Sequence, residues 1–235
     1  MPLTRAALAA AALLVALLFE GGVGAAARAI SFRTADGRTV QALINEANQR
    51  PAPAVVLVPM LGRPKDDWQF TAQRLADVNI TALMIDLPGQ GLPGDPKSLA
   101  AWSDDIKAAI SFLETRPETR PGALGVAGAS LGGNLAAVAA ATDPRVKSLV
   151  LISPSLDYRG VRIAAPMREY GARPALLMAG RQDFYAARSA RELADDPPGT
   201  RELAWSELAA HGTALLSREP DLVRALVEWF QRTLG

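Results

Sequence analysis

The chain has 235 residues, with one His, no Cys, and 25 basic against 24 acidic side chains. A chain without Cys forms no disulfides or thiolate metal sites, and a single His excludes metal sites built on two imidazoles. A net charge of +1 gives no electrostatic basis for nucleic-acid binding, and 49% hydrophobic residues indicate a sizeable core. We therefore expect no metal, no cofactor and no nucleic acid as partners.

Residues 1–29 have the layout of a secretory signal peptide. Arg5 precedes an uncharged run rich in Leu and Ala, from Ala6 to Phe19, and Ala27-Arg28-Ala29 forms an A-x-A cleavage site. The run is shorter than the roughly 18 residues required to span a bilayer. We expect cleavage after Ala29, an exported protein in the periplasm or the medium, and no stable membrane span in the mature chain. An uncleaved N-terminal membrane anchor is the alternative.

Residues 30–235 are expected to form a single domain in which short apolar strands alternate with helices. Strands are predicted at Ser31–Arg33, Thr39–Ile44, Ala54–Val58, Thr81–Ile85, Ala123–Ala127, Ser148–Ile152, Ala175–Ala179 and Arg201–Trp205. Helices are predicted at Trp68–Asp77, capped by Asp66-Asp67, at Ser98–Thr115, capped by Ser98, and at Leu131–Ala141, Ala186–Ala194 and Asp221–Leu234. This alternation predicts an α/β fold with a mostly parallel central sheet and helices on both faces. The two N-terminal strands, joined by a tight turn, would form an antiparallel edge.

The segment Gly128-Ala129-Ser130-Leu131-Gly132 lies between a predicted strand and a predicted helix. A serine at such a turn takes a strained backbone conformation, and its hydroxyl stands above the sheet. Residues two positions to either side must be small, because larger side chains would collide with the turning backbone. The helix behind Ser130 also points its positive end at a developing oxyanion. The pattern therefore predicts a nucleophile at Ser130, with an ordinary helix cap as the alternative.

Two more candidates follow the last two predicted strands. Asp183 comes after the first of these strands, and His211, the single histidine, comes after the second. A serine hydroxyl is a poor nucleophile until an imidazole accepts its proton and a carboxylate orients that imidazole. Asp183 could instead cap the helix that begins near Ala186, and Asp157 is a rival for the acid. His211 could be a surface or packing residue.

The order Ser130, Asp183, His211 resembles that of the α/β-hydrolase superfamily, and the resemblance covers about residues 30–235. The chain looks most similar to the small esterases and the dienelactone-hydrolase-like serine hydrolases. The resemblance implies a Ser130 nucleophile, a His211 base and an Asp183 acid. It also implies an oxyanion hole built from the backbone N–H of Leu131 and a second N–H from Leu61, or alternatively Met60. Pro59-Met60 stands where many relatives carry His-Gly, and relatives that use a Cys nucleophile differ from this chain.

These residues predict a serine hydrolase that cleaves a carboxylic ester or thioester through an acyl-enzyme on Ser130. The alternatives are a catalytically silent binding module, or a triad enzyme acting as a peptidase, a C–C hydrolase or a perhydrolase. Only residues 153–173 separate two strands where larger relatives carry a lid, so we expect little or no lid and a small acyl substrate. Four aromatic side chains near the site are predicted to pack rather than to bind substrate: Tyr158, Phe184, Tyr185 and Trp205.

Overall fold

The computed structural model describes residues 27–87, 95–196 and 199–235. The predicted signal peptide lies outside the described residues except for its last three. Within these ranges, no helix combines the length and the apolar character that crossing a membrane requires.

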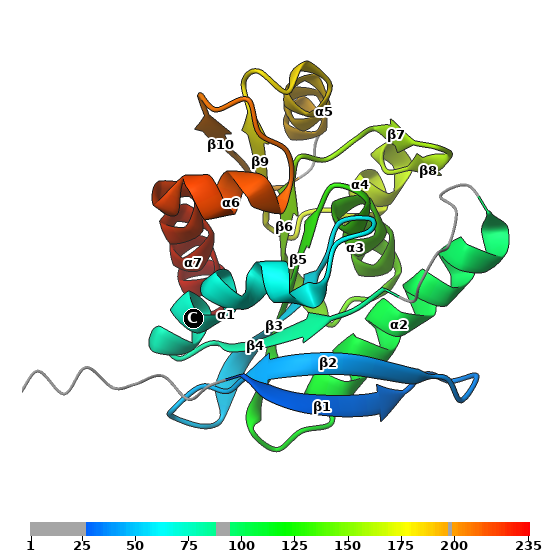
Figure 1. Cartoon of the computed structure of the whole chain (residues 1–235), viewed down its shortest axis with the longest axis vertical. Coiled ribbons are helices and arrows are strands. Elements are labelled where there is room, and N and C mark those ends of the chain that lie inside the picture. The colour runs from blue at the N-terminus through cyan, green and yellow to red at the C-terminus, as the bar shows by residue number, and fades with distance from the viewer. Residues whose placement is uncertain (1–26, 88–94, 197–198) are drawn as a thin grey trace, which may run out of the picture.

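Eight strands form one twisted sheet in the order β1-β2-β4-β3-β5-β6-β9-β10 (Figure 1). Their bounds are β1 Arg28–Arg33, β2 Thr39–Asn45, β3 Ala52–Val58, β4 Thr81–Ile85, β5 Thr119–Ala129, β6 Val146–Ile152, β9 Ala175–Gly180 and β10 Arg201–Ser206. From β4 to β10 in this order, each strand pairs in parallel with its neighbour. Strands β3, β4 and β9 have every residue buried, because helices cover both faces of the sheet.

The N-terminal edge of the sheet is antiparallel. Strand β1 pairs with β2 from Arg28 opposite Ile44 to Arg33 opposite Thr39, and β2 pairs antiparallel with β4. Strand β1 therefore begins three residues earlier than the sequence predicts. The predicted α/β class, with its mostly parallel sheet and antiparallel N-terminal edge, is confirmed.

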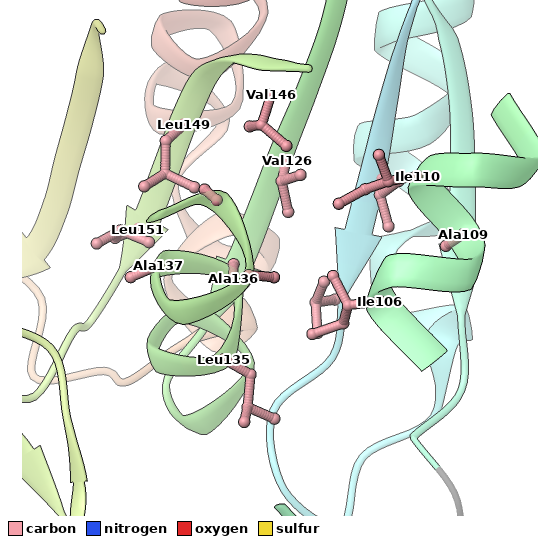
Figure 2. Close-up of a cluster of buried hydrophobic side chains, with 14 of the residues drawn as sticks. Ile106, Ala109, Ile110, Val126, Leu135, Ala136, Ala137, Val146, Leu149 and Leu151 are labelled. Atoms are coloured by element: carbon pink, nitrogen blue, oxygen red, sulfur yellow. The ribbon is translucent and has the colours of Figure 1, made fainter. Parts of the chain in front are cut away.

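Helices cover both faces of the sheet and enclose two apolar cores. The helices are α1 Gln69–Asp77, α2 Pro96–Glu114, α3 Leu131–Thr142, α4 Ala164–Tyr170, α5 Phe184–Asp195, α6 Thr213–Arg218 and α7 Pro220–Leu234. Figure 1 shows α1, α6 and α7 on one side of the sheet and α2, α3 and α4 on the other. On the latter side Ile106 and Ile110 of α2 and Leu135 of α3 belong to the same buried cluster as Val126 and Leu149 of the strands (Figure 2). These buried faces hold the strand ends in fixed positions.

Two predicted helix caps are wrong. Asp95, not Ser98, caps α2, and its carboxylate accepts a hydrogen bond from the Ser98 backbone N–H at 3.0 Å. Asp66 and Asp67 lie within a short 3₁₀ turn, η1 Lys65–Trp68, which precedes α1 and receives no side-chain cap. Asp67 is therefore available to bind other parts of the chain.

The connection between β6 and β9 holds a small hairpin and one short helix. The hairpin pairs β7 Asp157–Tyr158 with β8 Val161–Arg162, and α4 follows it. Asn134 of α3 ties this connection down, because its side-chain amide donates to the carbonyl oxygens of Ser155 and Val161 at 2.8 and 2.9 Å. The segment thus packs on α3.

Candidate active site

Ser130 is the single residue between β5 and α3, and its backbone is strained. Its φ of 51° and ψ of −122° lie in a region that L-residues rarely adopt. Its backbone N–H donates to the carbonyl oxygen of Ile152 at 2.8 Å, which fixes the turn against the neighbouring strand. Strain of this kind persists only where the surrounding structure imposes it, and it is concentrated at functional sites.

Glycines allow the chain to turn this sharply. A Cβ on Gly128 would collide with the backbone of Gly132, and a Cβ on Gly132 would collide with the carbonyl oxygen of Pro59. The two glycines are therefore required by close approach of backbone to backbone. The contact between Gly132 and Pro59 also brings the first turn of α3 against the segment that follows β3, which carries Met60 and Leu61.

The structure brings Ser130, His211 and Asp183 together. The Nε2 atom of His211 lies 2.8 Å from Ser130 Oγ, and its Nδ1 atom lies 2.5 Å from Asp183 Oδ2. Each side chain extends from a different connection at the carboxyl ends of the strands, where open α/β sheets place their sites. The His211 side chain is 44% exposed and that of Asp183 is 19% exposed, so the imidazole is accessible to a substrate while the carboxylate is largely covered.

Asp183 combines two roles that the sequence presented as alternatives. Its Oδ2 atom contacts His211, while its Oδ1 atom accepts a hydrogen bond from the Ala186 backbone N–H at 3.3 Å and caps α5. The helix therefore holds the carboxylate in the orientation that the imidazole requires.

Asp157 lies in a different environment. Its carboxylate accepts hydrogen bonds from the Arg162 guanidinium at 2.8 Å and from the Gly160 backbone N–H at 2.7 Å. The hydrogen bond from Arg162 lowers the pKa of Asp157. The geometry thus joins Asp183, and not Asp157, to the imidazole.

The predicted oxyanion residues lie on two adjoining segments. Leu131 is the first residue of α3 and is fully buried. Met60 and Leu61 belong to a tight turn in which the Arg63 backbone N–H donates to the Met60 carbonyl oxygen at 3.2 Å. The amino-terminal end of α3 supplies the positive end of a helix dipole beside Ser130.

The aromatic residues near the site divide into two pairs. Phe184 is 80% exposed, so the prediction that it serves packing is wrong. Tyr185 is 52% exposed, and its hydroxyl donates to the Asp157 carbonyl oxygen at 3.1 Å. The guanidinium groups of Arg181 and Arg191 both lie over the ring of Trp205, and Tyr158 packs against the buried core.

Sequence reasoning missed Ser153, whose buried hydroxyl contacts the segment after His211, and it missed helix α6. A lone Ser after a strand carries no local signal of such a contact. Over the part of the chain that the structure describes, no group of three His, Asp or Glu side chains is placed to hold a metal ion.

Comparison with known proteins agrees with this geometry. The model of the alpha/beta hydrolase family matches residues 55–233, and the chain belongs to this family. A carboxymethylenebutenolidase of Pseudomonas putida is 26% identical over 211 residues, which cover 80% of this chain and 86% of the relative. A thiohydrolase of Arthrinium phaeospermum is 32% identical over 131 residues, which cover 54% of this chain and only 42% of that protein.

Solved structures share the fold. A dienelactone hydrolase from Anabaena variabilis superimposes with a TM-score of 0.74 at 21% identity, covering 89% of this chain and 98% of that one. The esterase domain of a Rhodothermus marinus protein gives a TM-score of 0.72 at 17% identity, covering 89% of this chain and all of that one, 100%. The resemblance inferred from the sequence is confirmed. The protein is a hydrolase, and membership of this family implies that its substrate is a small molecule.

Proposed function

We propose that the protein is a serine-dependent carboxylic ester hydrolase. The observation that carries this proposal is the hydrogen-bonded row from Ser130 Oγ through His211 to Asp183, with spacings of 2.8 and 2.5 Å. These are the contacts that general-base activation of a hydroxyl requires.

In the proposed reaction His211 accepts the Ser130 proton as Oγ attacks the carbonyl carbon of an ester or thioester. The backbone N–H groups of Leu131 and Leu61, or of Met60 in place of Leu61, stabilise the oxyanion. His211 then donates its proton to the leaving oxygen or sulfur, and an acyl group remains on Ser130. Water, activated by the same imidazole, releases the acid. Asp183 keeps the imidazole oriented throughout.

The substrate class follows from the small size of the β6–β9 connection. The hairpin and α4 pack on α3, which supports an open site and short acyl groups. The thiohydrolase relative supports the inclusion of thioesters. We further propose that the protein is exported, on the basis of the apolar, uncharged run at residues 6–19 and the small residues that follow it.

A panel of p-nitrophenyl esters with increasing acyl length, measured beside aminoacyl and peptide substrates, tests the reaction. We expect ester hydrolysis that declines with acyl length, and covalent labelling by a fluorophosphonate probe. Ser130→Ala should abolish labelling and lower kcat by about 10⁶-fold. The matched control is Ser111→Ala, which removes a serine hydroxyl on α2 that accepts a hydrogen bond from Arg145.

Two results would contradict the proposal. Undiminished labelling of Ser130→Ala would exclude this nucleophile. A folded wild-type protein that neither reacts with the probe nor hydrolyses any ester would instead indicate a hydrolase fold that serves binding.

A further inference from the structure

Ser153 is a fully buried serine directly after the last residue of β6. Its φ of 50° lies in the left-handed region, which favours glycine. Its backbone N–H donates to the Met178 carbonyl oxygen at 2.7 Å, which extends the pairing between β6 and β9 by one residue. A glycine would adopt this backbone without strain, so a serine here indicates a use for the hydroxyl.

The hydroxyl of Ser153 contacts the backbone that carries His211. Its Oγ atom accepts a hydrogen bond from the Gly212 N–H at 2.9 Å, across 59 residues of sequence. Gly212 is buried and has a φ of 59°. A buried backbone N–H without a partner costs free energy, so this bond favours one position of the segment that follows His211.

Gly212 also packs closely against Met60. A Cβ on Gly212 would lie 2.6 Å from Met60 Sδ and 3.7 Å from Ala129 Cβ. The next residue is held as well, because the Thr213 hydroxyl donates to the Asp67 carboxylate at 3.1 Å. The backbone after His211 is thus confined between the end of β6 and the turn that carries the candidate oxyanion residues.

We propose that Ser153 is a positioning residue for His211, an inference that rests on the proposed serine-hydrolase function. Hydrogen bonds at the two ring nitrogens orient the imidazole, and the Ser153–Gly212 bond fixes the backbone from which the ring extends. Displacement of a catalytic group by about 1 Å can lower a rate by about 100-fold. The hydroxyl of Ser153 therefore acts on kcat through the base, without touching the substrate.

The test uses Ser153→Gly and Ser153→Ala in the full chain. Both variants remove the acceptor, and the Gly variant keeps a backbone that tolerates a positive φ, so it carries the test if the Ala variant does not fold. The matched control is Ser148→Ala. Ser148 lies on β6, the strand that Ser153 follows, is equally buried, and shares a hydrogen bond of 2.7 Å with the Thr233 hydroxyl, on helix α7.

We expect Ser153→Gly to lower kcat about 10- to 100-fold with KM changed less than twofold, and to slow fluorophosphonate labelling by the same factor as kcat. The strongly deshielded proton resonance of the His211–Asp183 hydrogen bond should broaden or shift. Ser148→Ala should leave kcat and this resonance unchanged. A folded Ser153→Gly variant that retains kcat within twofold, or one whose loss matches that of Ser148→Ala, would overturn the proposal. Failure of the proposed function is recognised separately, as full activity in Ser130→Ala.

Discussion

The carboxylate of Asp183 holds the imidazole of His211 with one oxygen, at 2.5 Å, while its other oxygen caps helix α5 at Ala186. The start of a helix and the orientation of a candidate catalytic base therefore depend on the same side chain.

The two roles of Asp183 should separate by mutation. Asp183→Asn keeps an oxygen for the cap but no longer stabilises an imidazolium, so kcat should fall about 10⁴-fold with little change in stability. Asp183→Ala should lose activity and also about 1 kcal/mol of unfolding free energy, because the cap is removed. Steady-state kinetics and urea unfolding measure the two effects. Asp157→Asn is the control, and a comparable loss of activity in that variant would reassign the acid.

The buried carboxyl of Asp105 predicts that the stability of the fold decreases as pH rises. Burial raises its pKa from 3.8 to about 6, although Arg38, at 2.8 Å, partly counteracts burial. A carboxyl with a raised pKa in the folded state binds its proton more tightly there than in the unfolded chain. The contribution of Asp105 to the free energy of unfolding therefore decreases as pH rises from about 4 to about 6, by at most about 3 kcal/mol.

Replacement of this buried carboxyl tests that dependence. Asp105→Asn should remove the decrease in unfolding free energy between pH 4 and 6. The neighbouring Asp104, whose side chain is 46% exposed on the same helix, provides the control variant Asp104→Asn. Urea unfolding at several pH values measures both. If the unfolding free energy of Asp105→Asn decreases with pH as steeply as that of the wild type, another group is responsible.

The glycines at the Ser130 turn should differ in their tolerance of a methyl group. Gly132→Ala places a Cβ against the backbone of Pro59, which cannot move without displacing β3, so we expect a loss of about 3 kcal/mol or failure to fold. Gly133→Ala places its Cβ 3.0 Å from the Gly128 carbonyl oxygen, a milder contact, and should cost less. Thermal unfolding compares the two variants. Equal tolerance would mean that the turn is less tightly packed than the structure indicates.

The start of β1 refines the predicted processing site. Cleavage after Ala29 would remove two residues of the strand, including Arg28, whose guanidinium pairs with Glu46 at 3.0 Å. The sequence Ala25-Ala26-Ala27 is also an A-x-A site, and cleavage there leaves the strand whole. We expect the mature protein to begin at Arg28, as mass spectrometry of the natural protein can measure. An N-terminus at Ile30 would instead favour cleavage after Ala29, and an intact Met1 would exclude cleavage.

The sequence predicted the strands and most helices because their signals are local. Buried parallel strands are short apolar runs, such as Thr81–Ile85, and the glycines around Ser130 report a turn at that position. The boundaries and caps of the helices depend on tertiary contacts, which the local sequence does not encode. Asp95 precedes a proline and caps α2 in place of Ser98, and α6 is a six-residue helix without a clear apolar period.

The site was predictable in its chain order but not in its supporting contacts. Ser130, Asp183 and His211 each follow a predicted strand, so their common edge follows from the topology. The bond between Ser153 and Gly212 depends on the contact of segments 59 residues apart, which no local pattern encodes.

His211 follows β10, the last strand and an edge of the sheet, and lies 81 residues after Ser130. During synthesis, the segment with the proposed nucleophile is complete well before the segment with the proposed base. A nascent or truncated chain that ends before β10 would display the serine without its proton acceptor and would be inert. On the proposed function, the appearance of hydrolytic activity reports the arrival of residues 201–235, and its time course in refolding should follow the docking of this edge.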